Sequence, residues 1–168
     1  GFTLVEIAIV LVIIGLLLGG VLKGQEMIEN SRIKAIVNDM KAVQAAYNSY
    51  MDRYKAVPGD ETNAVMTARG WTGTAGGNAN GVLAITAAQT FTNGGEQAAF
   101  WRALRASGLA VGDPTNNTAA SLPRHGAGGI IAVTADPNGI YGQAGVFVCA
   151  SGLSTKQAMG VDIMIDGP

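Results

Sequence analysis

The chain has 168 residues, of which 48% are hydrophobic and only 14% are charged, with a net charge of −1 and a mean hydropathy of +0.27. Soluble domains carry about 25% charged residues, so this composition favours contact with a membrane or with other subunits over an ordinary soluble enzyme. Near-zero net charge argues against a dedicated nucleic-acid-binding protein, and one cysteine excludes an intramolecular disulfide and a cysteine-rich metal site.

The composition changes sharply along the chain. Residues 1–58 contain 5 of the 24 glycines, whereas residues 59–168 contain the other 19. The first part is periodic, as a long helix should be, and the second is rich in turn signals. We therefore expect a membrane-spanning half-helix at 1–24, an amphipathic half-helix at 25–58 and a glycine-rich globular head at 59–168.

An apolar run opens the chain from Phe2 to Leu22 and reads FTLVEIAIVLVIIGLLLGGVL, with Glu6 as its one charged residue. As a helix it would be about 31 Å long, close to the roughly 30 Å hydrocarbon core of a bilayer. The alternative is a cleaved signal peptide, but neither a positively charged leading segment nor a small-residue cleavage site after the run is evident. The run predicts a membrane-spanning helix.

Glu6 is the most informative residue of this run. A carboxylate at mid-bilayer depth costs about 2.5–3.5 kcal/mol and usually has a functional partner. One interpretation is a carboxylate near the membrane interface, or one neutralised by protonation. The other is an ion pair with a positive group of another chain, for which an N-terminal amine is the nearest candidate of fixed position.

The segment Gly1-Phe2-Thr3-Leu4-Val5-Glu6, followed by the aliphatic run, resembles the processing site and helix of type IV pilins and type II secretion pseudopilins. The resemblance implies that a prepilin peptidase cuts between Gly1 and Phe2 and methylates Phe2. It also implies that Glu6 neutralises the amine of a neighbouring subunit during assembly. More weakly, the likeness extends through the helix to Tyr-Lys-Ala-Val-Pro-Gly-Asp at 54–60, and beyond Asp60 it becomes general.

Four glycines in the first half-helix form small-xxx-small pairs, Gly15 with Gly19 and Gly20 with Gly24. Such pairs allow helix backbones to approach closely, although each glycine costs about 0.8–1.0 kcal/mol relative to alanine in a helix. We interpret them as subunit-assembly positions together with Phe2 and Glu6. The alternative is that they are ordinary membrane-helix glycines.

The second half-helix carries an apolar stripe with a seven-residue repeat. The predicted helix-to-head packing residues are Ile33, Ile36, Met40, Val43, Tyr47, Tyr50 and Tyr54. Sustained heptads also suit a coiled coil, but a stripe ending in tyrosines favours packing against a sheet of the same chain. We expect Pro58 and Gly59 to end the helix.

The head is expected to contain a loop at 70–81, a helix at 96–107 stopped by Gly108, and short antiparallel strands at 130–135 and 145–150 joined around Asp-Pro-Asn-Gly. The last stretch favours a helix capped by Ser154 over a strand at 161–165. The predicted fold class is α+β, with the C-terminal half of the long helix packed on a small antiparallel sheet, as in pilins.

Residues that carry chemistry are sparse in the head. His125 lies in a glycine-rich segment without a ligand-spaced partner, and Cys149 within an apolar strand suits a buried small hydrophobe. Asp162 and Asp166 offer calcium oxygens but equally suit a solvated helix face. Asn116-Asn117-Thr118 fits a glycosylation sequon. We expect no catalytic residues, no metal and no cofactor.

Together these features predict a structural subunit, inserted in the bacterial inner membrane and then polymerised into a type IV pilus or pilus-like filament at the cell surface. The implied partners are other copies of the chain, the prepilin peptidase and the pilus assembly machinery, with no specific nucleic acid. A minor pilin and a secretion pseudopilin remain alternatives within the family. A monomeric membrane-anchored binding or adhesion domain is the alternative outside it.

Overall fold

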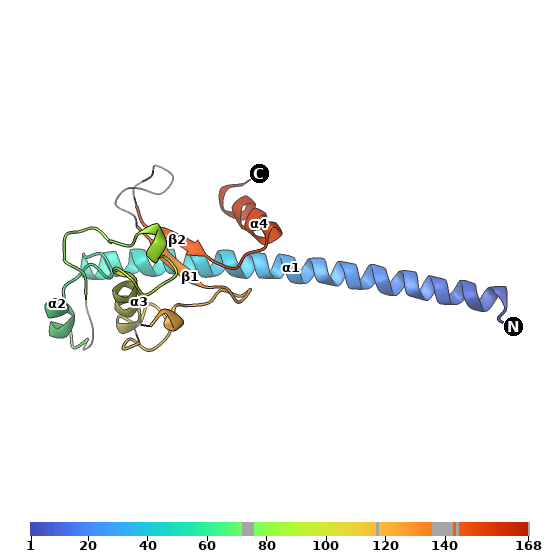
Figure 1. The fold of residues 1–168 in the computed structure, drawn as a ribbon, viewed down its shortest axis with the longest axis horizontal. Helices are drawn as coiled ribbons and strands as arrows, with labels where there is room; N and C mark the ends of the chain where they lie inside the picture. Colours follow the sequence, from blue (N-terminus) through green and yellow to red (C-terminus); the bar gives the residue numbers. More distant parts are fainter. Residues whose placement is uncertain (72–75, 117, 136–142, 144, 168) are drawn as a thin grey trace.

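The structure is a computed structural model that describes residues 1–71, 76–116, 118–135, 143 and 145–167. One long helix runs through the molecule, and all other elements gather around its C-terminal half, so that its N-terminal half projects alone (Figure 1). The elements in chain order are α1 (Leu4–Tyr54), α2 (Asn63–Ala68), η1 (Ala87–Gln89), α3 (Gln97–Ala106), η2 (Ala119–Ser121), β1 (Ile131–Thr134), β2 (Phe147–Ala150) and α4 (Thr155–Asp166). The α+β class is confirmed.

Helix α1 is unbroken over 51 residues, about 76 Å at 1.5 Å per residue. It ends at Tyr54, because Lys55 adopts the left-handed conformation (φ 54°) and its N–H bonds to the carbonyl of Met51. The expectation that Pro58 and Gly59 end the helix was wrong by one turn. A proline ring clashes with the carbonyl four residues before it, which here belongs to Tyr54, so the helical path already fails there.

Strands β1 and β2 form a two-stranded antiparallel sheet in which Ile131 pairs with Ala150 and Thr134 with Phe147. Both strands lie within the predicted segments. β1 is buried along its whole length and also contacts α3, whereas β2 is half-buried and contacts α1. The turn predicted at 136–139 lies outside the described residues.

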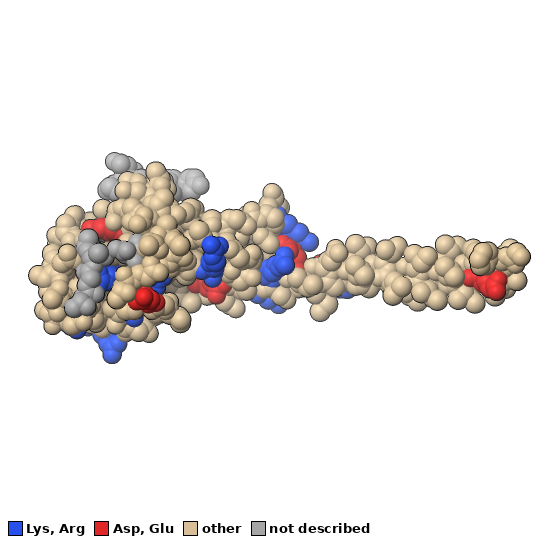
Figure 2. Space-filling model, turned by 60° about the horizontal axis from the view of Figure 1, so that its bottom comes forward, with Lys and Arg blue, Asp and Glu red and all other residues tan. Residues whose placement is uncertain are grey.

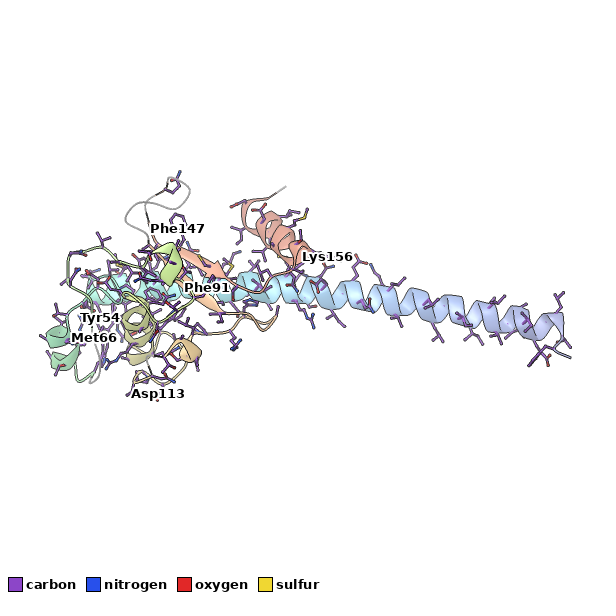
Figure 3. All side chains as sticks on the ribbon, in the orientation of Figure 1. Tyr54, Met66, Phe91, Asp113, Phe147 and Lys156 are labelled. Carbon is purple, nitrogen blue, oxygen red and sulfur yellow. The ribbon has the colours of Figure 1, made fainter. Side chains whose placement is uncertain are left out.

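The main core lies between α1, α3 and β1. Phe100, Trp101 and Leu104 of α3 are buried in it, as the helical spacing predicts, and Gly108 with φ 75° follows the helix end. At the far end of the head, α2 adds the buried Met66 near Tyr54 (Figure 3). This core fixes the C-terminal half of α1 to the head.

Helix α4 confirms the helical interpretation of the C-terminal stretch. Ser154 accepts a hydrogen bond from the backbone N–H of Gln157, and the Gln157 side chain accepts one from the N–H of Ser154, which is a complete capping box. Val161 packs in a second apolar cluster with Ile33, Ile36 and Val37 of α1. α4 is thereby attached to α1 at the point where the projecting half begins.

Candidate functional site

The projecting half of α1 is apolar and uncovered. Every residue from Phe2 to Leu22 is exposed, with Leu4 at 87% and Leu16 at 73%. The most apolar 18-residue stretch has no buried residue, and the helix is long and apolar enough to cross a membrane. In Figure 2 this half is uniformly uncharged apart from an acidic area near its tip, where Glu6 lies.

Glu6 belongs to a capping box at the tip of this helix. Its Oε2 accepts a hydrogen bond from the backbone N–H of Thr3 at 2.8 Å, and its own N–H donates to Oγ1 of Thr3 at 3.2 Å. Because Thr3 is the N-cap and Glu6 stands at the third helical position, the carboxylate is held beside the start of the helix, where the macrodipole favours a negative charge. Phe2 precedes Thr3 in the chain and is 88% exposed. The structure thus places Phe2 and Glu6 together at the exposed end of the molecule.

Gly15, Gly19 and Gly20 are exposed on α1, and Gly24 is half-buried. A Cβ atom added at any of them would meet nothing within 4 Å. Their lack of a side chain therefore serves no packing against the described part of the chain, and it leaves room for the backbone of a partner helix.

The seven residues predicted to pack against the head divide by burial. Ile33, Ile36, Val43 and Tyr50 are buried, while Met40, Tyr47 and Tyr54 are half-buried. Contact within the chain rather than a coiled coil accounts for this part of the stripe. The tyrosine end, however, meets more than the sheet: the Tyr47 ring stacks on Phe100 of α3 at 6.5 Å between centroids.

Val37 and Ala46 are also buried, although the seven-residue repeat does not select them. Val37 lies beside Ile36 in the cluster that includes α4, and Ala46 lies in the main core. The buried face of α1 is wider than a coiled-coil seam because head elements cover it from more than one direction. A 3.6-residue pattern with a broad apolar face would have included both positions.

A partly buried ionic cluster at the end of α1 has no signal in the sequence. Arg69 donates to both carboxylate oxygens of Glu61, at 2.6 and 2.7 Å, and the Tyr50 hydroxyl donates to Glu61 Oε2. The Arg69 guanidinium also lies 4.5 Å from the Tyr54 ring centroid and 5.3 Å from that of Trp71. Burial and the neighbouring Glu61 raise the pKa of Tyr50, so its hydroxyl stays protonated as a donor. The cluster fastens the helix end to the head.

His125 is a structural residue. Its Nδ1 accepts a hydrogen bond from the N–H of Ala127 at 3.2 Å, so Nε2 carries the proton and donates to the carbonyl of Ser151 at 2.8 Å. The ring is 3% exposed and ties the loop before β1 to the segment after β2. It is not presented to a substrate.

The other candidate groups are not brought together. Cys149 is half-buried, and burial raises the pKa of its thiol, which disfavours a nucleophilic role. Asp162 and Asp166 are exposed on α4, and within the described ranges no three His, Cys, Asp or Glu residues form a metal-ligand group. The sequon at Asn116-Asn117-Thr118 includes Asn117, which lies outside the described residues.

Among the described residues, the apolar half of α1 is thus the surface left open to a partner. The chain matches no protein family model, no curated protein and no solved structure in the comparisons made.

Proposed function

We propose that this chain is the structural subunit of a type IV pilus or pilus-like filament. The subunit is held in the bacterial inner membrane by residues 2–22 and then polymerises, so that the apolar half-helices form the filament core and the heads form its outer layer. A prepilin peptidase would process the chain at Gly1 and Phe2. Minor pilin and secretion pseudopilin are variants of the same proposal.

One observation carries the proposal: half of a continuous 51-residue helix is apolar, and none of the residues that the structure describes covers it. A tether needs only enough length to cross the bilayer. Here the exposed half continues without a break into the half that carries the head, so that each head has a rigid core element attached to it. Equivalent helices packed side by side would then place the heads in a regular outer array.

The energetics require a specific contact within that core. Lipid tails are as apolar as leucine, so moving the helix from lipid to protein yields no hydrophobic gain by itself. Close backbone contact at the four glycines would supply van der Waals packing in place of lipid. Glu6 paired with the N-terminal amine of a neighbour would select the axial register, because a carboxylate left unpaired in an apolar core is strongly unfavourable.

The decisive experiment compares two changes at the same helix tip. We expect Glu6→Ala to leave membrane insertion intact and to abolish or cripple filament assembly, as measured by membrane fractionation and by electron microscopy of the cell surface. Thr3→Ala is the matched control, because it removes the capping hydroxyl but retains the carboxylate.

If Glu6 acts between subunits, Thr3→Ala keeps most of the filament yield. Equal losses in the two variants would reduce Glu6 to a helix cap, and normal yield from Glu6→Ala would refute its assembly role.

A further inference from the structure

Helix α4 carries large apolar side chains that no part of the described chain covers. Met159, Ile163, Met164 and Ile165 are 61, 52, 43 and 48% exposed, whereas Val161 is the apolar residue that α4 buries against α1. Figure 1 shows α4 standing off one side of α1, and Figure 3 shows its side chains beyond Lys156 extending into open space. Four large apolar side chains on so short an exposed helix indicate a contact surface.

A shallow groove of about 360 Å³ lies on α1 at the same level. Its floor is apolar, with Met27 and Ile28 at 63 and 56% exposed. The lining residues are Met27, Ile28, Ser31, Arg32, Ala35 and Gly126. Gly126 closes the head side of the groove, because its N–H bonds to Asp39 and it lies against Ala35 without a side chain between them.

The exposed C-terminal end of α4 with Ile163, Met164 and Ile165, which we call the α4 tip, and the groove lie on opposite sides of α1. Gly160 of α4 packs against Ile33, since a Cβ added there would lie 2.6 Å from Ile33 Cδ1, whereas Gly126 packs against Ala35. Two residues along an α-helix turn it by about 200°. The apolar tip of α4 therefore cannot reach the groove of its own chain, and contact between them requires two copies.

The charges of the two surfaces are complementary. The exposed end of α4 carries Asp162 and Asp166, together with the negative end of the helix dipole, and Lys156 lies at the opposite end of α4. The groove carries Arg32, whose guanidinium is half-exposed and only 3.9 Å from Glu29, at the limit of an ion pair. Within the described part of the chain, Arg32 makes only this long ion pair with Glu29, and its side chain is 54% exposed, so it can also face an acidic group of a partner.

We propose that the α4 tip of one copy docks into the Met27–Ala35 groove of the next copy, with Ile163 and Met164 on the apolar floor and the α4 acids facing Arg32. This inference rests on the proposed function and names a second contact between filament subunits, outside the apolar core. Because the two surfaces are different and lie on opposite faces, the contact is head-to-tail. Repetition of such a contact forms an open helical polymer unless the rotation happens to close a ring.

The geometric test is disulfide cross-linking in assembled filaments. Ile28→Cys is combined with Met164→Cys in a Cys149→Ser background, and the same cells are imaged for filaments. We expect a ladder of covalent multimers under oxidation, since the pair cannot bridge within one chain across α1. The matched control pairs Met164→Cys with Val111→Cys, a fully exposed head position, and should give no ladder.

The electrostatic test uses charge reversal and needs no cysteine. Arg32→Glu should lower filament yield several-fold, and adding Asp162→Arg and Asp166→Arg to it should restore most of the yield.

The outcomes separate the two proposals. Filaments that form without the 28–164 ladder and without charge rescue overturn the docking contact and leave the filament function standing. If the thiol introduced by Met164→Cys is protected from a soluble maleimide only in membrane-bound, unassembled subunits, α4 faces lipid, which also overturns the contact. Absence of filaments from the unmodified chain refutes the filament function itself.

Discussion

Tyr50 joins the end of α1 to the head. It is fully buried, its hydroxyl donates to Glu61, and Glu61 is held from the other side by both terminal nitrogens of Arg69. Removing a buried carboxylate from water costs free energy, which its hydrogen-bond donors offset. When one donor is lost, part of this cost is no longer offset. The hydroxyl of Tyr50 therefore matters beyond the packing of its ring.

We predict that Tyr50→Phe lowers the free energy of unfolding by about 1–2 kcal/mol, because it leaves Glu61 with one donor fewer while preserving the ring. Denaturation of the full chain in detergent, followed by tryptophan fluorescence, measures the change. Tyr54→Phe is the control, since Tyr54 is half-buried and contacts Arg69 and Trp71 through its ring. Similar losses for the two variants would contradict a specific role for the Tyr50 hydroxyl.

Glu96 makes the stability of the head depend on pH. Burial raises the pKa of its carboxyl above the usual 4.5, the charge of Asp60 adds to this, and the hydrogen bond from the Ala84 N–H opposes it. The folded chain therefore keeps a proton at pH values where the unfolded chain has lost it. Stability conferred by this group is present below pH 4.5 and is lost as the pH rises through the raised pKa.

We predict that unfolding free energy falls as the pH rises above 4.5 and that Glu96→Gln removes this slope. The amide oxygen of glutamine can still accept the Ala84 N–H. Asp52 and Asp113 have pKa values lowered below 3.8, so they titrate beneath this window. Thermal melts of the full chain in detergent between pH 4 and 7 measure the slope, with the exposed Glu26→Gln as control. An unchanged slope in Glu96→Gln would exclude Glu96 as its source.

At the scale of elements, the sequence predicts those parts whose signals are local. The long helix, α3, α4 with its Ser154 cap and the two strands each follow from periodicity, capping residues or β-branched runs within a few residues. The predicted end of α1 was one turn too late, because the steric effect of Pro58 reaches back to Tyr54. Local patterns thus account for the elements more accurately than for their boundaries.

Parts of the head that depend on contacts between residues far apart in the sequence have no local sequence signal. Asp60, for example, accepts hydrogen bonds from the backbone N–H groups of Asn80 and Gly81 at 3.1 and 2.8 Å, which orders the end of the predicted 70–81 loop. The Glu61–Arg69 ion pair likewise joins residues at a spacing that matches no regular element. Such pairs become apparent only when the chain has folded back on itself.

The sequence indicates the assembly residues that we propose on the projecting half of α1, but not the surfaces that several elements form together. Phe2, Glu6 and the four glycines are recognisable in sequence because an uncovered apolar helix has no other elements to complicate its pattern. The α4 tip and the Met27–Ala35 groove were not, because their opposition across α1 depends on where α4 and Gly126 pack. A surface formed by several elements requires the fold.

At the scale of the whole molecule, the low charge has an uneven distribution with a structural consequence. The projecting half-helix bears one charged residue from Phe2 to Leu22, and in Figure 2 the charged side chains gather on the head and at its junction with α1. A membrane anchor and a filament core both require such a helix. Only the filament core also requires neighbouring helices to approach each other closely along their length.

We predict that Gly15→Cys combined with Gly24→Cys, in a Cys149→Ser background, gives a ladder of covalent multimers on oxidation of cells that bear filaments. The two positions lie nine residues apart, about 13.5 Å along the helix, so each chain can bond to two neighbours and propagate the ladder. Both are open to a partner, since an added Cβ meets no atom of the same chain within 4 Å. Gel electrophoresis without reductant measures the outcome, and the pair Gly15→Cys with Val111→Cys is the control because Val111 is fully exposed on the head. A tethered monomer would remain monomeric with either pair, whereas a packed core requires that the ladder appear only with the glycine pair.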